Sequence, residues 1–175
     1  DAIREKIVTS TTVYVGEEGN LLEQKEENCH VLKINDPILT DTDLLKIRNM
    51  KVDGFRVAEI STTYYKNSSL EKAIDYLFIQ VDRAIREGMN ILILSDRGVD
   101  EYHIAIPSLL ATSAVHQHLV RTKRRTEVAM ILETGEPREV HHFATLLGYG
   151  ASAINPYLAH ESIKQLIDTD MLQKD

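Results

Sequence analysis

The regular part of the hydrophobic pattern lies after Gly54, where short apolar runs alternate with longer amphipathic stretches. Short apolar runs between turn residues predict strands, and apolar residues at helical spacing predict helices. The predicted strands are Phe55–Ile60, Ile91–Leu94, Val128–Leu132 and Ala151–Ile154. The predicted helices run from a Ser68–Glu71 capping box to Gly88, from Pro107 through Leu119, from Arg138 to Gly148, and over Ser162–Ile167. Strands that alternate with helices in this way form a parallel sheet.

The two most apolar strands, Ile91–Leu94 and Val128–Leu132, show no alternation of apolar and polar residues. Both faces of the sheet should therefore be covered. The length of the repeats fits a (β/α)8 barrel, in which eight such units fill about 250 residues. We predict an α/β fold of parallel βα repeats that forms a partial or incomplete (β/α)8-like barrel. The pattern alone leaves an open, doubly wound sheet as the alternative.

The first part of the chain is less regular than the second. Its pattern predicts a strand over Ile7–Val15, a turn at Gly16–Asn20 and a second strand over His30–Ile34. The length of the whole chain suits one domain with one core. Within that domain we expect an irregular N-terminal segment over residues 1–53 and a βα-repeat region over residues 54–175.

A short helix is predicted after Asp36-Pro37. Thr40 or Asp41 supplies its N-cap, because short oxygen-bearing side chains accept hydrogen bonds from the free N–H groups of a first turn. The apolar residues of this helix are expected on one buried face, formed by Leu44, Leu45 and Ile47.

Composition and charge narrow the classes of partner. The chain of 175 residues is 43% hydrophobic and 27% charged, which is ordinary for a globular protein. Its formal net charge of −7 argues against a nucleic-acid or membrane-surface partner. One basic cluster opposes this trend, and we interpret it as a cationic helix terminus: Arg121, Lys123, Arg124 and Arg125. No apolar run approaches the roughly 20 residues of a membrane span.

Cys29 is the only cysteine, which excludes an internal disulfide and any site that needs several thiolate ligands. A single unpaired cysteine fits a reducing compartment. The charged residues Asp1, Arg4 and Glu5 at the start of the chain are unlike a signal peptide. We therefore expect the protein to be cytoplasmic.

Polar and charged side chains are concentrated in the segments that follow three of the predicted strands. In a parallel α/β sheet the carboxyl ends of the strands meet at one rim, where ligands gather. We expect these residues to share that rim. The candidates are Asp96, Arg97, Asp100, Glu133, Glu136, Arg138, His141, His142, Asn155 and Tyr157.

Two interpretations of the rim differ in kind. Carboxylates, guanidinium groups and imidazoles that converge are the material of acid–base or Mg²⁺-assisted chemistry on a small anionic substrate. Alternatively, Arg97 and Arg138 pair with Asp96, Glu133 or Glu136 and hold the loops together. We favour the second interpretation and keep a stand-alone α/β enzyme as the alternative function.

The histidines do not predict a metal site. Ligands on one helix are best placed three or four residues apart, whereas His116 and His118 are two apart and His141 and His142 are adjacent. Gly148-Tyr149-Gly150 follows a predicted helix and not a strand, which is the wrong context for a dinucleotide-binding loop. We predict no catalytic, cofactor-binding or metal-ligating residue in this chain.

Several ordered motifs closely resemble the central domain of the glutamate synthase large subunit. They are Ile91–Asp100, Ile106–Ala111, Glu133–Ala144, Leu147–Gly150 and Asn155–Leu158. The first part of the chain resembles the same domain more loosely through Ile3–Glu5, Gly19–Leu22 and Asp36–Thr40. Nearly the whole chain is therefore covered by the resemblance.

The resemblance implies a role in nitrogen assimilation. Enzymes of this family make L-glutamate from glutamine and 2-oxoglutarate, with electrons from NAD(P)H or ferredoxin. It also implies two partners in the same polypeptide: an amidotransferase domain that releases ammonia, and a barrel domain that binds FMN and an iron–sulfur cluster. The central domain resembles that barrel without binding the flavin, links the two catalytic domains and helps to enclose the ammonia path.

The chain departs from the family wherever catalysis is concerned. Asp1 stands at its start instead of a nucleophilic cysteine, and a single cysteine cannot ligate an iron–sulfur cluster. We therefore expect a domain fragment that is inactive by itself and binds no cofactor. The rim residues would contact the neighbouring domains, and the isolated fragment would self-associate through uncovered sheet edges and apolar surface.

Overall fold

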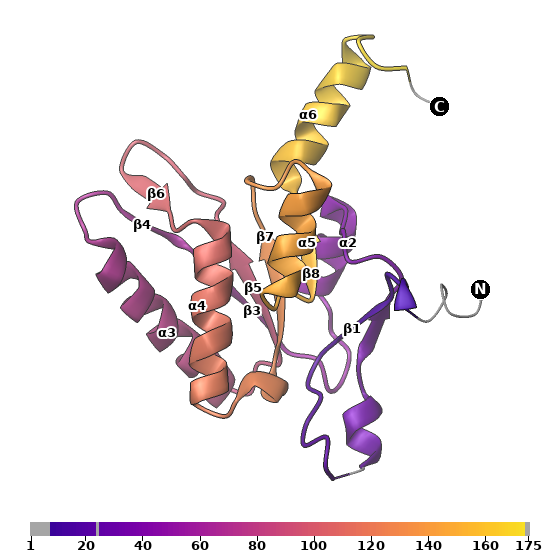
Figure 1. The fold of residues 1–175 in the computed structure, drawn as a ribbon, viewed down its shortest axis with the longest axis vertical. Helices are drawn as coiled ribbons and strands as arrows, with labels where there is room; N and C mark the ends of the chain where they lie inside the picture. The colour runs from indigo at the N-terminus through magenta and orange to yellow at the C-terminus, as the bar shows by residue number, and fades with distance from the viewer. Residues whose placement is uncertain (1–7, 24, 174–175) are drawn as a thin grey trace.

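A parallel sheet in the order β3-β5-β7-β8 forms the centre of the computed structural model, which describes residues 8–23 and 25–173 (Figure 1). Its strands are β3 (Val57–Ser61), β5 (Ile91–Ser95), β7 (Ala129–Glu133) and β8 (Ala153–Asn155). Each strand lies beside the next strand of the βα series, as in a barrel, but the sheet does not close. The predicted partial barrel of parallel βα repeats is confirmed, and the doubly wound order is wrong.

Three helices cover one face of the sheet: α3 (Leu70–Arg86), α4 (Ser108–Arg121) and α5 (Val140–Gly148) (Figure 1). Side chains alternate between the two faces of a strand, so Leu92 and Leu94 of β5 point to the same side. They pack with Leu77 and Val81 of α3 in one apolar core. The three helices α3, α4 and α5 thus correspond to the outer helical layer of a (β/α)8 barrel.

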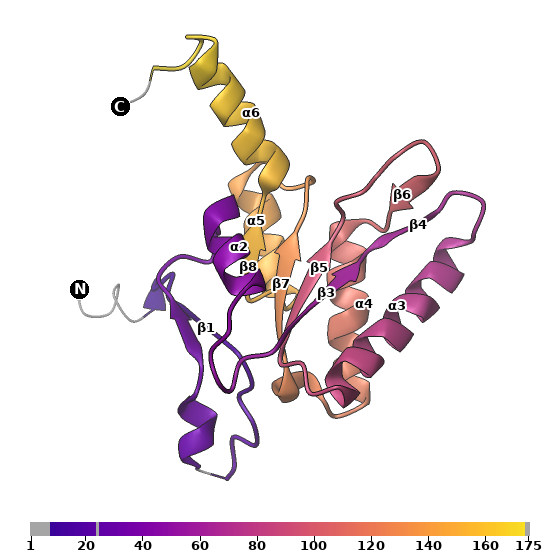
Figure 2. The same ribbon diagram turned by 180° about the vertical axis from the view of Figure 1, so that it is seen from behind.

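The opposite face is covered by the N-terminal segment. Helix α2 (Asp41–Arg48) and strand β1 (Val13–Val15) lie on this side (Figure 2). Leu44 of α2 packs in a second apolar core with Ile93 and Ile131. In a complete barrel this face would be enclosed by further strands. Here a helix excludes water from it.

The N-terminal segment also runs along the edge of β8. The N–H of Ile154 donates to the carbonyl of Pro37 at 2.7 Å, and the N–H of Leu39 donates to the carbonyl of Ile154 at 2.8 Å. Ile38 and Ile154 form a parallel bridge. The polar backbone at this edge is therefore satisfied within the chain, which protects the edge from pairing with another strand.

Two small antiparallel sheets complete the fold. β1 pairs with β2 (Leu32–Ile34), and a short 3₁₀ helix at Glu26–Cys29 lies between them. β4 (Thr63–Tyr65) pairs with β6 (His103–Ala105) and forms a ribbon that projects past the carboxyl end of the main sheet (Figures 1 and 2). This ribbon was not predicted, and the region of β6 was expected to be loop, because three-residue strands carry no periodic signal.

Several expected boundaries shift in the first part of the chain. The strand expected over Ile7–Val15 is confined to β1, and Ile7 lies outside the described residues. The turn expected at Gly16–Asn20 lies later, where the N–H of Glu23 donates to the carbonyl of Asn20 at 3.0 Å. Among the residues of the resemblance, Ile3–Glu5 also lie outside the described part.

The helix caps follow the predicted chemistry with one shift. Thr40 caps α2 by accepting from the N–H of Asp43 at 3.2 Å, as predicted. Helix α3 is capped by Ser69, which accepts from the N–H of Lys72 at 3.3 Å, so the cap predicted at Ser68 is wrong by one residue. Leu45 was placed on the buried face of α2 but is 53% exposed.

The remaining helices match the prediction in number and position, although their ends differ. Helix α5 begins at Val140 rather than Arg138, and α6 (Tyr157–Asp168) is longer than the predicted Ser162–Ile167. No helix within residues 8–23 and 25–173 is long and apolar enough to cross a membrane.

Replacing Leu77 should weaken the core between α3 and the sheet. The side chain is 1% exposed, so Leu77→Ala removes buried methyl groups and leaves a cavity, which costs about 2–5 kcal/mol. Urea unfolding measures this loss. Ile79→Ala is the matched control on the same helix, because Ile79 is 58% exposed. Equal losses for the two variants would contradict this packing.

Candidate functional site

Glu133 is the centre of the polar cluster at the carboxyl end of the sheet. Its side chain is 2% exposed, because it follows Ala129 and Ile131 on the face that α2 covers. Its Oε2 accepts from Arg48 at 2.7 Å and from the Ser95 hydroxyl at 2.6 Å. Its Oε1 accepts from Nε of Arg97 at 2.7 Å. Both carboxylate oxygens are therefore engaged.

Arg48 connects α2 to two strands of the sheet. Its Nη2 reaches Glu133, and its Nε lies 2.8 Å from a carboxylate oxygen of Glu59 on β3. The Glu59 oxygen lies off the N–H direction, so this contact is an ion pair without a hydrogen bond. A cation in the last turn also complements the helix dipole. α2 is thereby fixed to the middle of β3 and to the carboxyl end of β7.

Arg97 connects the cluster to the start of α6. Its guanidinium carbon lies 4.0 Å from the centre of the Tyr157 ring, a cation–π contact. Nη1 of Arg97 lies 3.6 Å from a carboxylate oxygen of Glu161, and Nη2 lies 3.9 Å from a carboxylate oxygen of Asp41. Burial lowers the pKa of Arg97, but the hydrogen bond and the charge of Glu133 outweigh it, so the pKa is raised. Arg97 is held as a cation between acidic partners.

Asp96 is buried beside this cluster but does not pair with Arg97. It is 5% exposed and accepts from the Thr134 hydroxyl at 2.6 Å and from the N–H of Gly135 at 3.1 Å. Burial, and then a hydrogen bond with Asp96, raise the pKa of the Tyr157 hydroxyl. Asp96 therefore holds the loop after β7 against the end of β5.

Asn155 joins β8 to the N-terminal segment. It is fully buried, and its Nδ2 donates to the carbonyl of Leu39 at 3.0 Å and to the carboxylate of Asp41 at 2.8 Å. Its Oδ1 has no hydrogen-bond partner within residues 8–23 and 25–173. Asn155 thus fixes the segment that precedes α2 against the end of the sheet.

Asp100 lies in the loop that leads from β5 into β6. It accepts from the N–H groups of Tyr102 and His103, each at 2.7 Å, and its Oδ1 lies 3.0 Å from Nδ1 of His103. The two backbone hydrogen bonds lower the pKa of Asp100. Its contacts among the described residues are with Tyr102 and His103 and not with Glu133, so its place at the rim stays a prediction.

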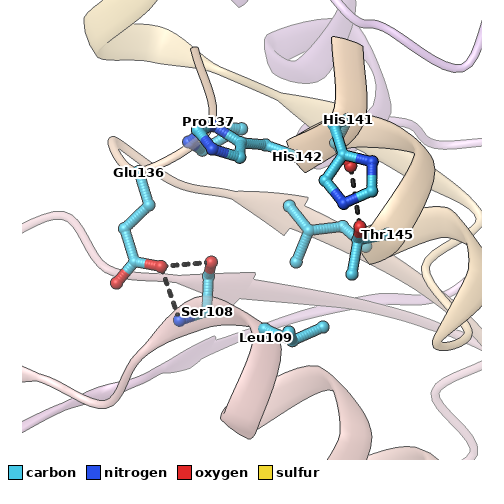
Figure 3. A pocket seen from close by; sticks show the side chains of 8 residues that line it. Ser108, Leu109, Glu136, Pro137, His141, His142 and Thr145 are labelled. Carbon is cyan, nitrogen blue, oxygen red and sulfur yellow. Dashed lines mark hydrogen bonds between the residues drawn. The ribbon is translucent and has the colours of Figure 1, made fainter. Parts of the chain in front are cut away.

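Glu136 supplies the N-cap that α4 lacks in its own sequence. Pro107 precedes the helix and has no side-chain oxygen, whereas Glu136 accepts from the N–H of Ser108 at 2.9 Å and from its hydroxyl at 2.5 Å. Figure 3 shows the Glu136 carboxylate turned toward Ser108. This contact anchors the loop after β7 to the start of α4.

A pocket of about 440 Å³ lies beside this cap, with Ser108 and Glu136 on one side and His141 and Thr145 on the other (Figure 3). The apolar part of the pocket lining is formed by Leu109, Pro137 and Leu146. Within residues 8–23 and 25–173, no group of three or more histidine, cysteine, aspartate or glutamate residues could hold a metal ion.

The two arginines of the favoured interpretation behave differently. Arg97 pairs with Glu133 as predicted. Arg138 makes no ion pair with the described residues, and only its N–H is engaged, donating to Nδ1 of His142 at 3.2 Å. Arg48 and Asp41 were not among the predicted rim residues, because they lie 85 and 114 residues from their partners Glu133 and Asn155. Their one local signal is their position in the last and first turns of a predicted helix.

Glu133→Ala should destabilise the fold severely. The substitution leaves Arg48 and Arg97 without their shared acceptor, and breaking a buried pair in this way costs about 3–5 kcal/mol. Chemical denaturation measures the free energy of unfolding. Glu161→Ala is the control, because its 3.6 Å contact with Arg97 is solvent-exposed and worth about 1 kcal/mol or less. A loss that small for Glu133→Ala would contradict a structural role.

Glu136→Ala should loosen the start of α4 by about 1 kcal/mol, the usual value of a helix cap. Hydrogen exchange should quicken at the first turn of α4. Glu139→Ala is the matched control, because Glu139 makes no side-chain cap for α5. Unchanged exchange at α4 in the Glu136 variant would show that the contact with Ser108 is dispensable.

Comparison with known proteins gives one consistent family. The family model described as the glutamate synthase central domain matches residues 1–175. The large chain of NADPH glutamate synthase from Bacillus subtilis is 44% identical over 172 residues, which cover 98% of this chain and 11% of that protein. NADH glutamate synthase from Schizosaccharomyces pombe is 40% identical over 172 residues, 95% of this chain and 8% of that protein.

A ferredoxin-dependent relative extends the same result. Ferredoxin-dependent glutamate synthase 2 from Synechocystis is 41% identical over 171 residues, which cover 94% of this chain and 11% of that protein. The chain thus spans about a tenth of the length of the curated relatives it matches. The resemblance found in the motifs is confirmed over the whole chain. This chain belongs to the glutamate synthase central domain family.

Proposed function

We propose that this chain is the non-catalytic linking domain of a glutamate synthase, an enzyme that makes L-glutamate from glutamine and 2-oxoglutarate. The observation that carries the proposal is the engagement of Glu133 with Arg48, Arg97 and Ser95. A general acid or base must reach a substrate, whereas this carboxylate is enclosed by its own partners. The polar groups at the rim serve the fold, and catalysis belongs to the neighbouring domains.

The same residues argue against a cofactor in this domain. Barrels of this type often hold phosphate groups at the carboxyl end of the sheet. Here the arginines at that end, Arg48 and Arg97, are both engaged by Glu133, so neither is free to bind an FMN phosphate. Cys29 is the only thiol and does not suffice for an iron–sulfur cluster. FMN and the cluster are assigned to another domain of the full enzyme.

The partners in this proposal are the amidotransferase and FMN-binding domains of the same polypeptide. Residues that remain accessible are the candidates for direct contact: Asp100, Glu136, Arg138, His141 and His142. Buried Asp96, Glu133 and Asn155 act indirectly, by holding the loops. In this arrangement the domain helps to enclose the path of ammonia in a cytoplasmic enzyme, and the chain self-associates when its partners are absent.

The alternative function, a stand-alone α/β enzyme, required rim carboxylates that are free to act on a small anionic substrate. The family assignment gives it no support. The contacts of Glu133 and Asp96 also leave neither carboxylate available for that role. The linking domain is therefore the function that the geometry supports best.

Ligand-binding measurements on the purified chain test the proposal. We expect no thermal stabilisation by Mg²⁺, 2-oxoglutarate or glutamine, because a ligand that binds the folded state raises its melting temperature. We also expect no quenching of FMN fluorescence and no ammonia release from glutamine. Stoichiometric FMN binding or unaided glutamine hydrolysis would overturn the proposed function.

A further inference from the structure

The apolar side of α6 is uncovered. The helix stands away from the sheet in both views, and none of its residues is buried (Figures 1 and 2). At 100° per residue, Leu158, Ile163 and Leu166 fall on one side of the helix, and they are 38%, 48% and 41% exposed. A helix with such a stripe normally buries it against another element.

The start of α6 is fixed so that this stripe faces away from the rim. Tyr157 and Glu161, one turn apart on the polar side, both contact Arg97. Arg97 is itself held by buried Glu133. The orientation of α6 is therefore set by the rim through its polar side, which leaves the apolar side available to another part of the protein.

The chain reverses direction immediately after α6. Asp170 adopts a left-handed conformation with φ 56°. The N–H of Asp170 donates to the carbonyl of Ile167 at 3.1 Å, and the N–H of Met171 donates to that of Leu166 at 2.9 Å. These are the two hydrogen bonds of a Schellman motif, which brings the residue after the turn beside the last turn of the helix. Figure 1 shows the chain turning back at this point.

Met171 and Leu172 extend the apolar stripe. They follow the reversal, are 77% and 46% exposed, and both donate their N–H groups to the carbonyl of Leu166. After the reversal the chain therefore lies beside the last turn of α6, and its first residues there, Met171 and Leu172, are apolar. In the Bacillus subtilis relative, the region that matches this chain is 11% of the protein, so most of such a polypeptide lies outside it.

We propose that an amphipathic helix, from the polypeptide that follows residue 175, packs antiparallel along the Leu158–Ile163–Leu166 stripe and forms a helical hairpin with α6. Glu161, Lys164 and Asp168 lie on the opposite side of α6, so burial of apolar area and not charge carries this contact. The inference rests on the proposed function only in placing the chain within a longer polypeptide.

Hydrogen–deuterium exchange compares α6 in the 175-residue chain and in the longer polypeptide that contains it. Amides of residues 158–168 should exchange at least about tenfold more slowly in the longer protein, because the second helix covers them. Ile163→Ser with Leu166→Ser should abolish the slowing. The matched control is Lys164→Ser with Gln165→Ser, which adds the same two serines to the polar side and should retain it.

The serine variants are suited to this test because Ile163 and Leu166 are exposed in the shorter chain, whose melting temperature should not fall. Equal exchange in both lengths, or slowing that survives Ile163→Ser with Leu166→Ser, would overturn the inference. Slowing that disappears on about hundredfold dilution would assign the stripe to a second copy and also overturn it. Glutamine-dependent glutamate formation, assayed on the same longer protein, reports separately on the proposed function.

Discussion

The carboxylate of Glu133 is buried at the end of β7, where an isolated charge would be strongly unfavourable. Arg48, Ser95 and Arg97 compensate for that burial with hydrogen bonds from α2, β5 and the loop after β5. The contact with Arg48 places α2 across the sheet, and the contacts of Arg97 orient α6. The contacts of this one buried charge therefore fix the positions of the N-terminal segment and the last helix on the βα repeats.

That constraint explains how part of a barrel can be stable without the rest. An open half of a (β/α)8 barrel would expose its inner face and two strand edges to water. Here α2 and β1 cover the inner face, and the segment at Pro37–Leu39 satisfies the edge of β8. Asn155 fixes the same segment through Leu39 and Asp41. The irregular first part of the chain thus supplies the surfaces that missing strands would otherwise supply.

The structural use of the rim bears directly on the proposed function. Carboxylates and guanidinium groups at the ends of parallel strands suggest an active site, yet here they bind one another at hydrogen-bonding distance. A domain whose polar rim is internally satisfied can hold its shape while adjoining parts of the polypeptide carry the chemistry. The apolar surface along α6 still lacks a partner among the described residues, so association there is driven by burial of apolar area rather than by ion pairs.

The sequence by itself determined the family, the βα repeats and most helices, because periodicity, caps and turn residues act between neighbours along the chain. It identified the buried strand Ile91–Leu94, and it included Thr40 among two possible caps and Glu133 among three possible partners of Arg97. Only the tertiary structure decided that Arg48 reaches Glu133 and that β4 pairs with β6. The physical reason is that such contacts join residues far apart in the chain, and their partners are set by where the crossovers and the covering helix place them.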